Sequence, residues 1–183
     1  LKVSECTACM KRIVAMPTAG SCGVIPAVLV PLVKERAISD ESVIEALYVA
    51  AGFGQIIATR SSISGAEGGC QAEVGTASAM AAAAGTHLGG GTGLMCSYAC
   101  AMALSNLMGL VCDPIAGLVE IPCVQRNVIG AINALSCANM ALAGVEHKIP
   151  ADEVIDAMRA VGDSMSSDLK ETARGGLAGT PTA

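Results

Sequence analysis

The stretch that decides the fold is VGTASAMAAAAGTHLGGGTGLMCSYACAMALSNLMGLVC, residues 74–112, which contains no Asp, Glu, Lys or Arg. Small residues dominate it, and alanine is the best helix former among the amino acids. The run GGGTG at residues 89–93 divides it in two. Residues 71–84 and 94–108 are therefore predicted to form two helices that are apolar all round, which is typical of helices buried inside a protein.

A membrane span is the alternative interpretation of this stretch, because about 20 apolar residues cross a bilayer. Its composition argues against insertion, since Ala, Gly, Ser and Thr outnumber Leu and Ile. Its flanks are Glu73 and Asp113, and neither a basic anchor nor an aromatic belt borders it. We therefore expect buried central helices and no contact with a membrane.

Residues before the uncharged stretch carry several signals for helix starts and ends. Ser39 followed by Asp40 and Glu41 favours a helix start, because a hydroxyl caps free N–H groups and carboxylates favour the positive end of the helix dipole. Gly52 and Gly54 are expected to end this helix. Proline is tolerated poorly inside helices, so Pro31 is expected to kink or shorten a helix over residues 24–33.

On the C-terminal side, residues 124–143 are mostly apolar, and residues 152–161 carry apolar side chains at helical spacing. Asp168 and Glu171 have the spacing of a capping box, and Gly175-Gly176 is expected to stop the short helix that follows. Few segments alternate as strands do. The sequence predicts an all-α fold: one compact domain over residues 1–183, with Ala/Gly-rich buried helices and Gly-rich loops at helix N-termini. Because the chain starts at Leu1 without a methionine, we expect it to be a fragment.

Charge and cysteine content narrow the functional class. The net charge of −5, without a basic cluster, argues against a nucleic-acid-binding surface. Nine cysteines in a chain with 52% hydrophobic residues do not suggest a disulfide scaffold, because such scaffolds are short and poor in core residues. We expect a reducing cytoplasm and thiols that are buried or that bind a metal.

Two Gly- and Ser-rich loops precede predicted helices: TAGSCG at residues 18–23 and SSISGAEGGC at residues 61–70. Each offers backbone N–H groups and hydroxyls at a helix N-terminus, a combination that binds anions such as a carboxylate. The alternative is that they serve only as turns and caps, since Gly and Ser dominate turns.

Three cysteines, Cys70, Cys112 and Cys123, lie next to Gly or Pro in turn-like surroundings. Their spacing matches neither a zinc finger nor a ferredoxin motif, so spacing alone leaves open that they are simply buried thiols. The other cysteines are predicted to be structural or to lie outside a principal site: Cys6, Cys9, Cys22, Cys96, Cys100 and Cys137. The histidines, His87 and His147, form no recognisable catalytic triad, because G-x-S-x-G is absent.

Four long motifs resemble the α chain of bacterial iron–sulfur-dependent L-serine dehydratases. They are MPTAGSCGVIPA (16–27), SGAEGGCQAEVG (64–75), GLVCDPIAGLVEIPCVQRN (109–127) and DLKETARGGLA (168–178). The resemblance covers nearly the whole chain. It implies a [4Fe–4S] cluster held by Cys70, Cys112 and Cys123, with one iron that lacks a cysteine ligand and can act as a Lewis acid.

The implied reaction is β-elimination of L-serine to pyruvate and ammonia, a step of serine catabolism that feeds gluconeogenesis. The residues implied to contact the substrate are Thr18, Ser21, Ser64, Gly65, Glu67, Gly68 and Arg126. Glu67 is the candidate for the substrate ammonium, and Arg126 is either a charged clamp or a structural ion-pair partner.

Family members also carry a β chain or β domain with a Ser-His-Thr motif, which this sequence lacks. The resemblance therefore implies that the catalytic base is supplied by a β partner, and we expect an oligomer. The alternative function is a non-catalytic iron–sulfur or metal-binding regulatory module, which a fourth protein ligand to the cluster would favour. A pyridoxal-phosphate enzyme is disfavoured, because no lysine lies in a Gly-rich phosphate-binding loop.

Overall fold

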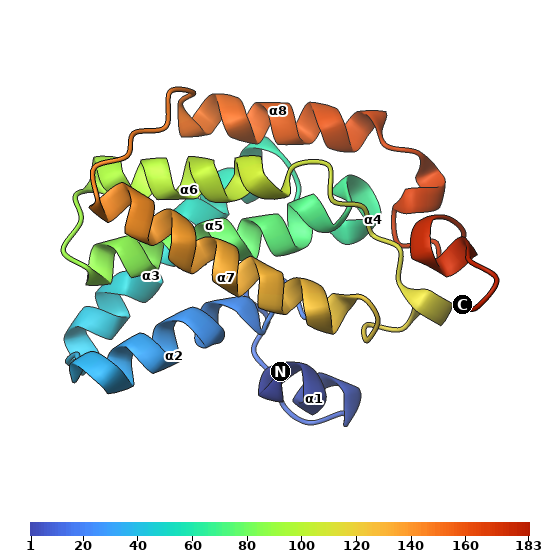
Figure 1. Cartoon of the computed structure of the whole chain (residues 1–183), viewed down its shortest axis with the longest axis horizontal. Coiled ribbons are helices and arrows are strands. Elements are labelled where there is room, and N and C mark those ends of the chain that lie inside the picture. The colour runs from blue at the N-terminus through green and yellow to red at the C-terminus, as the bar shows by residue number, and fades with distance from the viewer.

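The computed structural model describes all 183 residues as a bundle of helices without a β-strand, so the predicted all-α fold is confirmed (Figure 1). Its α-helices are α1 (Lys2–Ala8), α2 (Val24–Arg36), α3 (Asp40–Arg60), α4 (Gly65–Gly68), α5 (Thr76–Leu88), α6 (Gly93–Leu107), α7 (Cys123–Leu142) and α8 (Ala151–Ser164). Shorter turns are the π-helix η1 (Gln71–Gly75) and the 3-10 helices η2 (Ile115–Gly117), η3 (Ser167–Leu169) and η4 (Gly176–Gly179).

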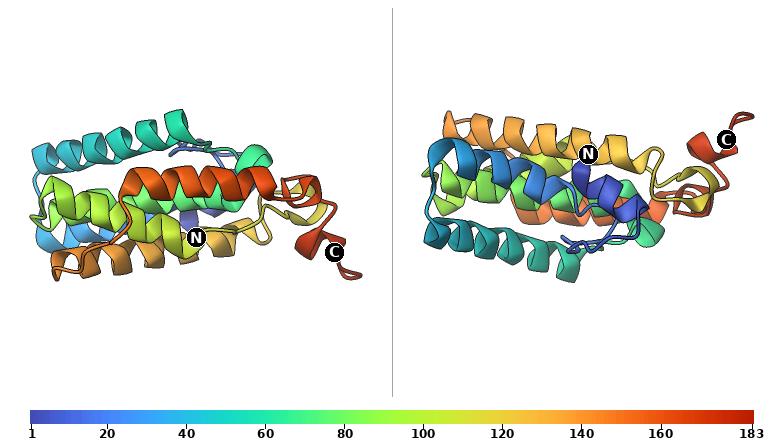
Figure 2. Two further views of the ribbon diagram at one scale, coloured as in Figure 1. Left: turned by 90° about the horizontal axis from the view of Figure 1, so that it is seen from above. Right: turned by 90° about the horizontal axis from the view of Figure 1, so that it is seen from below.

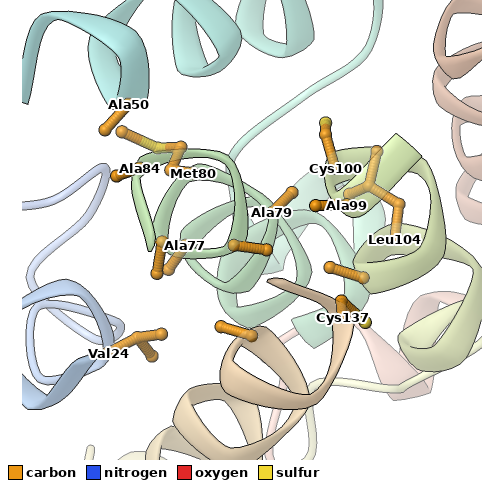
Figure 3. Close-up of a cluster of buried hydrophobic side chains, with 14 of the residues drawn as sticks. Val24, Ala50, Ala77, Ala79, Met80, Ala84, Ala99, Cys100, Leu104 and Cys137 are labelled. Atoms are coloured by element: carbon orange, nitrogen blue, oxygen red, sulfur yellow. The ribbon is translucent and has the colours of Figure 1, made fainter. Parts of the chain in front are cut away.

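Helix α5 is the centre of the bundle, and α2, α3, α6 and α7 surround it (Figures 1 and 2). Eleven of its 13 residues are buried. Its small side chains allow close approach: Ala77 and Met80 lie among Val24 and Ala50 of neighbouring helices (Figure 3). A single cluster of 29 buried hydrophobic residues forms the core.

The uncharged stretch 74–112 is folded as predicted. It forms α5 and α6, which have 13 and 15 residues and are joined by a glycine turn. Cys96, Cys100 and Cys137 are buried as expected. The core cluster includes Cys100 and Cys137, and also Cys70 and Cys112. The helix that is long and apolar enough to cross a membrane is instead α3, at the edge of the bundle (Figure 2), and one such helix is weak evidence for a span.

The expected end of α3 at Gly52 and Gly54 is wrong. Ser39 caps the helix as predicted, since its hydroxyl accepts the Ser42 N–H at 3.3 Å, but the helix continues to Arg60. Gly54 is buried against α5, and a Cβ there would lie 2.8 Å from the sulfur of Met80. This glycine serves close helix packing, which overrides its weak helix propensity.

Pro31 does not shorten the helix as one expectation had it, because α2 continues past it to Arg36 and ends where Ala37 adopts a left-handed conformation. A proline removes one intrahelical hydrogen bond, and the burial of Val24, Ile25, Val28 and Leu29 on the preceding turns stabilises α2.

The short helix expected after Asp168 does not form. Ser166 caps the 3-10 turn Ser167–Leu169 instead, and the chain then pairs with Cys112. The Cys112 N–H donates to the Leu169 carbonyl, and the Glu171 N–H donates to the Cys112 carbonyl, both at 2.8 Å. These long-range bonds occupy backbone groups that a helix would have used.

Candidate metal centre

Cys70 and Cys112 meet at the end of the bundle where α4, η1 and the segment after α6 converge. Ligand atoms of Cys70, Glu73 and Cys112 all lie within 4.8 Å of one another. Both cysteines are buried, with 1% and 2% of their surface exposed. Cys70 directly precedes the π-helix, and the backbone pairing with residues 169–171 anchors Cys112. Pi-helical turns occur frequently at functional sites.

Cys123 is the first residue of α7 and is 9% exposed. Its sulfur is not part of the group within 4.8 Å, although the charges of Cys70 and Glu73 both act on its thiol. The structure therefore brings the thiols of Cys70 and Cys112 together at one end of the bundle, and Cys123 lies outside that group at the start of α7. The group contains two soft sulfur donors and one carboxylate, and thiolates are the ligands that iron–sulfur clusters use.

The three thiols differ in acidity. The hydrogen bond from Cys112 and the nearby Arg126 guanidinium lower the pKa of Cys70, against the effect of burial. The same bond, together with burial, raises the pKa of Cys112. Burial raises the pKa of Cys123 to about 11. Metal binding needs thiolates, so loading this site requires the loss of protons from these thiols.

Arg126 is held by a buried ion pair. Its Nη1 atom donates to Asp113 Oδ1 at 2.6 Å and to the Val111 carbonyl at 2.8 Å, and it lies 3.7 Å from the sulfur of Cys70. The arginine side chain is 15% exposed and the aspartate 3%. Asp113 also accepts the Leu177 N–H at 2.7 Å. Of the two roles considered for Arg126, the geometry shows the structural ion pair, which joins α7 to the C-terminal segment.

The loop of residues 18–23 leads into α2, as predicted, and faces the thiols. Thr18 Oγ1 donates to Glu73 Oε1 at 2.5 Å and lies 2.8 Å from the hydroxyl of Ser21, which is fully buried. Asn127 of α7 fastens this loop: its amide donates to the Gly20 carbonyl at 2.7 Å and to the Cys123 carbonyl at 2.9 Å. Hydrogen bonds of the Asn127 side chain thus link the loop of residues 18–23 to Cys123.

The loop of residues 61–70 forms α4 and brings its glycines to the centre. A Cβ at Gly65 would lie 2.9 Å from the Cys112 sulfur and 3.3 Å from Glu73 Oε2. Ser64 precedes α4, and Gly68 is buried against Ala72 and Gly162. Side chains larger than hydrogen are excluded at Gly65 by the thiol itself.

Glu67, the sequence-based candidate for the substrate ammonium, is not brought to this centre. It is exposed, and its Oε2 accepts a hydrogen bond from Ser62 at 2.6 Å. The histidines also lie elsewhere: His87 is 3.6 Å from Glu45, and His147 is hydrogen-bonded to Ser105 and the Ile149 carbonyl.

Sequence reasoning missed two carboxylates at the centre, Glu73 and Glu171. Both border Gly65, where a Cβ would lie 3.3 Å from the first and 3.4 Å from the second. Burial raises the pKa of Glu73, as does the charge of Glu171, while the Thr18 hydrogen bond lowers it. The position of Glu73 three residues after Cys70 could have indicated that it lies near this cysteine. The approach of Glu171 could not be predicted locally, because it depends on the backbone pairing of residues 169–171 with Cys112.

Gln71 holds the π-helix in place between two other segments. It is buried, its Nε2 donates to the Met158 carbonyl of α8 at 2.9 Å, and its Oε1 accepts the Gly109 N–H at 2.8 Å. Its own N–H donates to the Leu110 carbonyl at 2.8 Å. These bonds set the position of Cys70 relative to the segment that carries Cys112.

Comparison with known proteins adds an independent line of support. A family model described as "Serine dehydratase alpha chain" matches residues 1–178. The chain is 54% identical over 182 residues to a "Probable L-serine dehydratase, alpha chain" of Latilactobacillus sakei, covering all of this chain and 87% of that protein. It is 53% identical over 179 residues to the protein of the same name from Bacillus subtilis, covering 98% of this chain and 60% of that one.

Longer relatives match over the same region. "L-serine dehydratase TdcG" of Escherichia coli is 44% identical over 180 residues, which cover 97% of this chain and 40% of that protein. The chain thus spans 87%, 60% and 40% of the length of these three relatives. With a family model over nearly its full length and relatives at 44–54% identity, the chain belongs to the serine dehydratase alpha-chain family.

Proposed function

We propose that this chain is the catalytic α portion of an L-serine dehydratase, which eliminates water from L-serine and yields pyruvate and ammonia. The observation that carries the proposal is the convergence of Cys70 and Cys112 with Cys123 beside them. Two hydroxyl- and glycine-rich loops border these thiols. The names of the relatives support the same reaction.

We further propose that Cys70, Cys112 and Cys123 hold a [4Fe–4S] cluster. Three soft sulfur donors fit this group better than they fit a hard cation, which prefers oxygen ligands. When bound, the cluster supplies a Lewis acid, at the iron that lacks a cysteine, for the departure of the serine hydroxyl. Arg126 stabilises the negative charge of the Cys70 thiolate, since its Nη1 lies 3.7 Å from that sulfur.

The protein residues bind and orient serine in this proposal. We assign the substrate carboxylate to the loops of residues 18–23 and 64–68, because Gly65 borders the thiol of Cys112 and Thr18 contacts Glu73. Loss of the α-proton and of the hydroxyl gives aminoacrylate, which tautomerises and hydrolyses to pyruvate and ammonia. Burial of the centre beneath the loops excludes water from the reacting atoms until that hydrolysis.

The α-proton requires a base, which we assign to a β chain or β domain. Both histidines of this chain lie away from the centre, as described above. Exposed apolar side chains on the outer face of α7, Val128, Ile129 and Ile132, provide a surface suited to contact with another chain, so we also propose an oligomer. All nine cysteines are free, which is consistent with a reducing cytoplasm, our proposed location.

One observation favours a second candidate function, a regulatory iron–sulfur or metal-binding module. Glu73 carries a carboxylate within 4.8 Å of two of the thiols, so it is placed to serve as a fourth protein ligand. A cluster with four protein ligands has no open iron for a substrate. This candidate therefore predicts metal binding without turnover under any condition.

Anaerobic reconstitution with iron and sulfide tests the proposal. We expect broad iron–sulfur absorbance that is lost in Cys70→Ala, Cys112→Ala and Cys123→Ala, and that is retained in Cys96→Ala, a buried cysteine away from the centre. Pyruvate formation from L-serine is expected when a β chain is added. Absence of iron–sulfur absorbance in the wild-type chain would overturn the cofactor assignment, and absorbance without turnover in the complex would favour the regulatory module.

A further inference from the structure

Glu73 is a half-buried carboxylate in the candidate metal centre without a cation beside it. None of the six ion pairs in the structure includes it. Its charged neighbour Glu171 has the same sign, and the nearby Arg126 is paired with Asp113. The thiolates that a metal requires add further negative charge around it.

Two glycines and one hydroxyl close over this carboxylate. A Cβ at Gly20 would lie 2.5 Å from Glu73 Oε1, and a Cβ at Gly65 would lie 3.3 Å from Oε2. The two glycines belong to the two loops that sequence analysis selected for substrate binding. Thr18 donates to Oε1 at 2.5 Å, and no side chain of the protein donates a hydrogen bond to Oε2. A larger residue at either glycine would require the Glu73 carboxylate to shift.

A partly buried charge is favoured by a partner, because even partial removal from water weakens its hydration. The protein provides Glu73 with a single hydroxyl donor and no counter-charge. Hydrogen bonds to a carboxylate from an ammonium group are short and stronger than those between neutral groups. A cation that enters from solution would therefore gain more at this position than at an exposed carboxylate such as Glu67.

We infer that Glu73 binds the α-ammonium group of the amino-acid substrate, through the carboxylate oxygen that Thr18 does not occupy. This inference rests on the proposed function and assigns to Glu73 the role that the sequence had suggested for Glu67. Glu73 is then a specificity residue: it selects an amino acid over a hydroxy acid of the same shape. The substrate carboxylate stays assigned to the two loops.

The test compares two ligands and two matched variants. L-Serine and glycerate both carry a carboxylate and a terminal hydroxyl, but glycerate has a second hydroxyl in place of the ammonium. Their affinities are measured by calorimetry with the anaerobically reconstituted chain, as wild type, Glu73→Gln and Glu67→Gln. Glutamine keeps an acceptor for Thr18 and removes the charge. The visible absorbance of each variant is recorded in parallel.

We expect the wild type to bind L-serine more tightly than glycerate. Loss of a charge-assisted bond in Glu73→Gln should weaken L-serine binding roughly 10- to 100-fold and leave glycerate nearly unchanged. Glu67→Gln should behave as wild type, and all three proteins should keep their absorbance.

Several results would overturn the inference. These are an equal response of both ligands to Glu73→Gln, a loss of selectivity in Glu67→Gln alone, or a loaded wild-type chain that does not prefer L-serine. Loss of the iron–sulfur absorbance in Glu73→Gln would also overturn it, because Glu73 would then be a ligand of the cluster. Absence of that absorbance in the wild type is a different result, since it refutes the cofactor assignment itself.

Discussion

Gly130 is where α7 crosses the start of α2 and the π-helix, and replacing it by alanine probes how closely this bundle is packed. A Cβ there would lie 2.8 Å from Cγ1 of Val74 and 3.3 Å from Cγ2 of Val24. Valine has few rotamers, so neither neighbour turns aside easily. The carbonyl of Gly130 also accepts a hydrogen bond from the Ser78 hydroxyl at 2.8 Å, and this bond resists displacement of α7.

Gly52 of α3 is the matched control, because it is exposed and no atom lies within 4 Å of the corresponding Cβ. In both helices, alanine improves intrinsic helix stability by about 1 kcal/mol over glycine. Overpacking at Gly130 adds a cost of about 1–3 kcal/mol. Gly52→Ala should therefore raise the free energy of unfolding by up to about 1 kcal/mol, while Gly130→Ala should leave it unchanged or lower it by up to about 2 kcal/mol.

The difference between the two variants isolates the packing cost, since the helix propensity is common to both. We expect a difference of about 1–3 kcal/mol, equivalent to roughly 2–12 °C in Tm for a chain of this length. Urea unfolding of the reduced, metal-free chain, followed by circular dichroism, measures it. Equal shifts for the two variants would refute the claim that α7 is in close contact with both valines.

Two further predictions concern buried polar groups. Gln71→Leu leaves the Gly109 N–H without its acceptor and should lower the free energy of unfolding by about 1–3 kcal/mol. The control Gln55→Leu, at an exposed position, should change it by less than about 0.5 kcal/mol in the same urea experiment. Equal effects of the two substitutions would contradict the bridging role of Gln71. Burial raises the pKa of Cys100 to about 12. At pH 8, iodoacetamide should therefore label the exposed Cys9 and leave Cys100 unmodified until the chain is unfolded, which peptide mass spectrometry measures. Similar labelling rates of the two thiols in the folded chain would contradict this prediction.

Local chemistry was sufficient for much of the fold. The lack of charge in residues 74–112 predicted α5 and α6, because a helix without a polar face has to be buried. Ser39 predicted the start of α3, since capping involves only the next turn of the chain. The Gly and Pro residues beside Cys70, Cys112 and Cys123 distinguished their surroundings from those of Cys96, Cys100 and Cys137, which lie within apolar helical runs. The four motifs and their resemblance indicated the family.

Tertiary structure decided which glycines lie inside helices and which carboxylates lie near the thiols. Gly54 continues a helix because Met80 packs against it, and the segment after Asp168 pairs with Cys112 instead of forming a helix. Glu67 and Glu73 lie in the same motif, yet the first is exposed and the second is half-buried beside the thiols. The sequence by itself determined the buried helices, because these follow from composition and short-range pattern, and the resemblance of its four motifs indicated the family and the three candidate cysteines. Only the tertiary structure selected Glu73, because its surroundings come from Thr18, Gly65 and Glu171, which lie far apart along the chain.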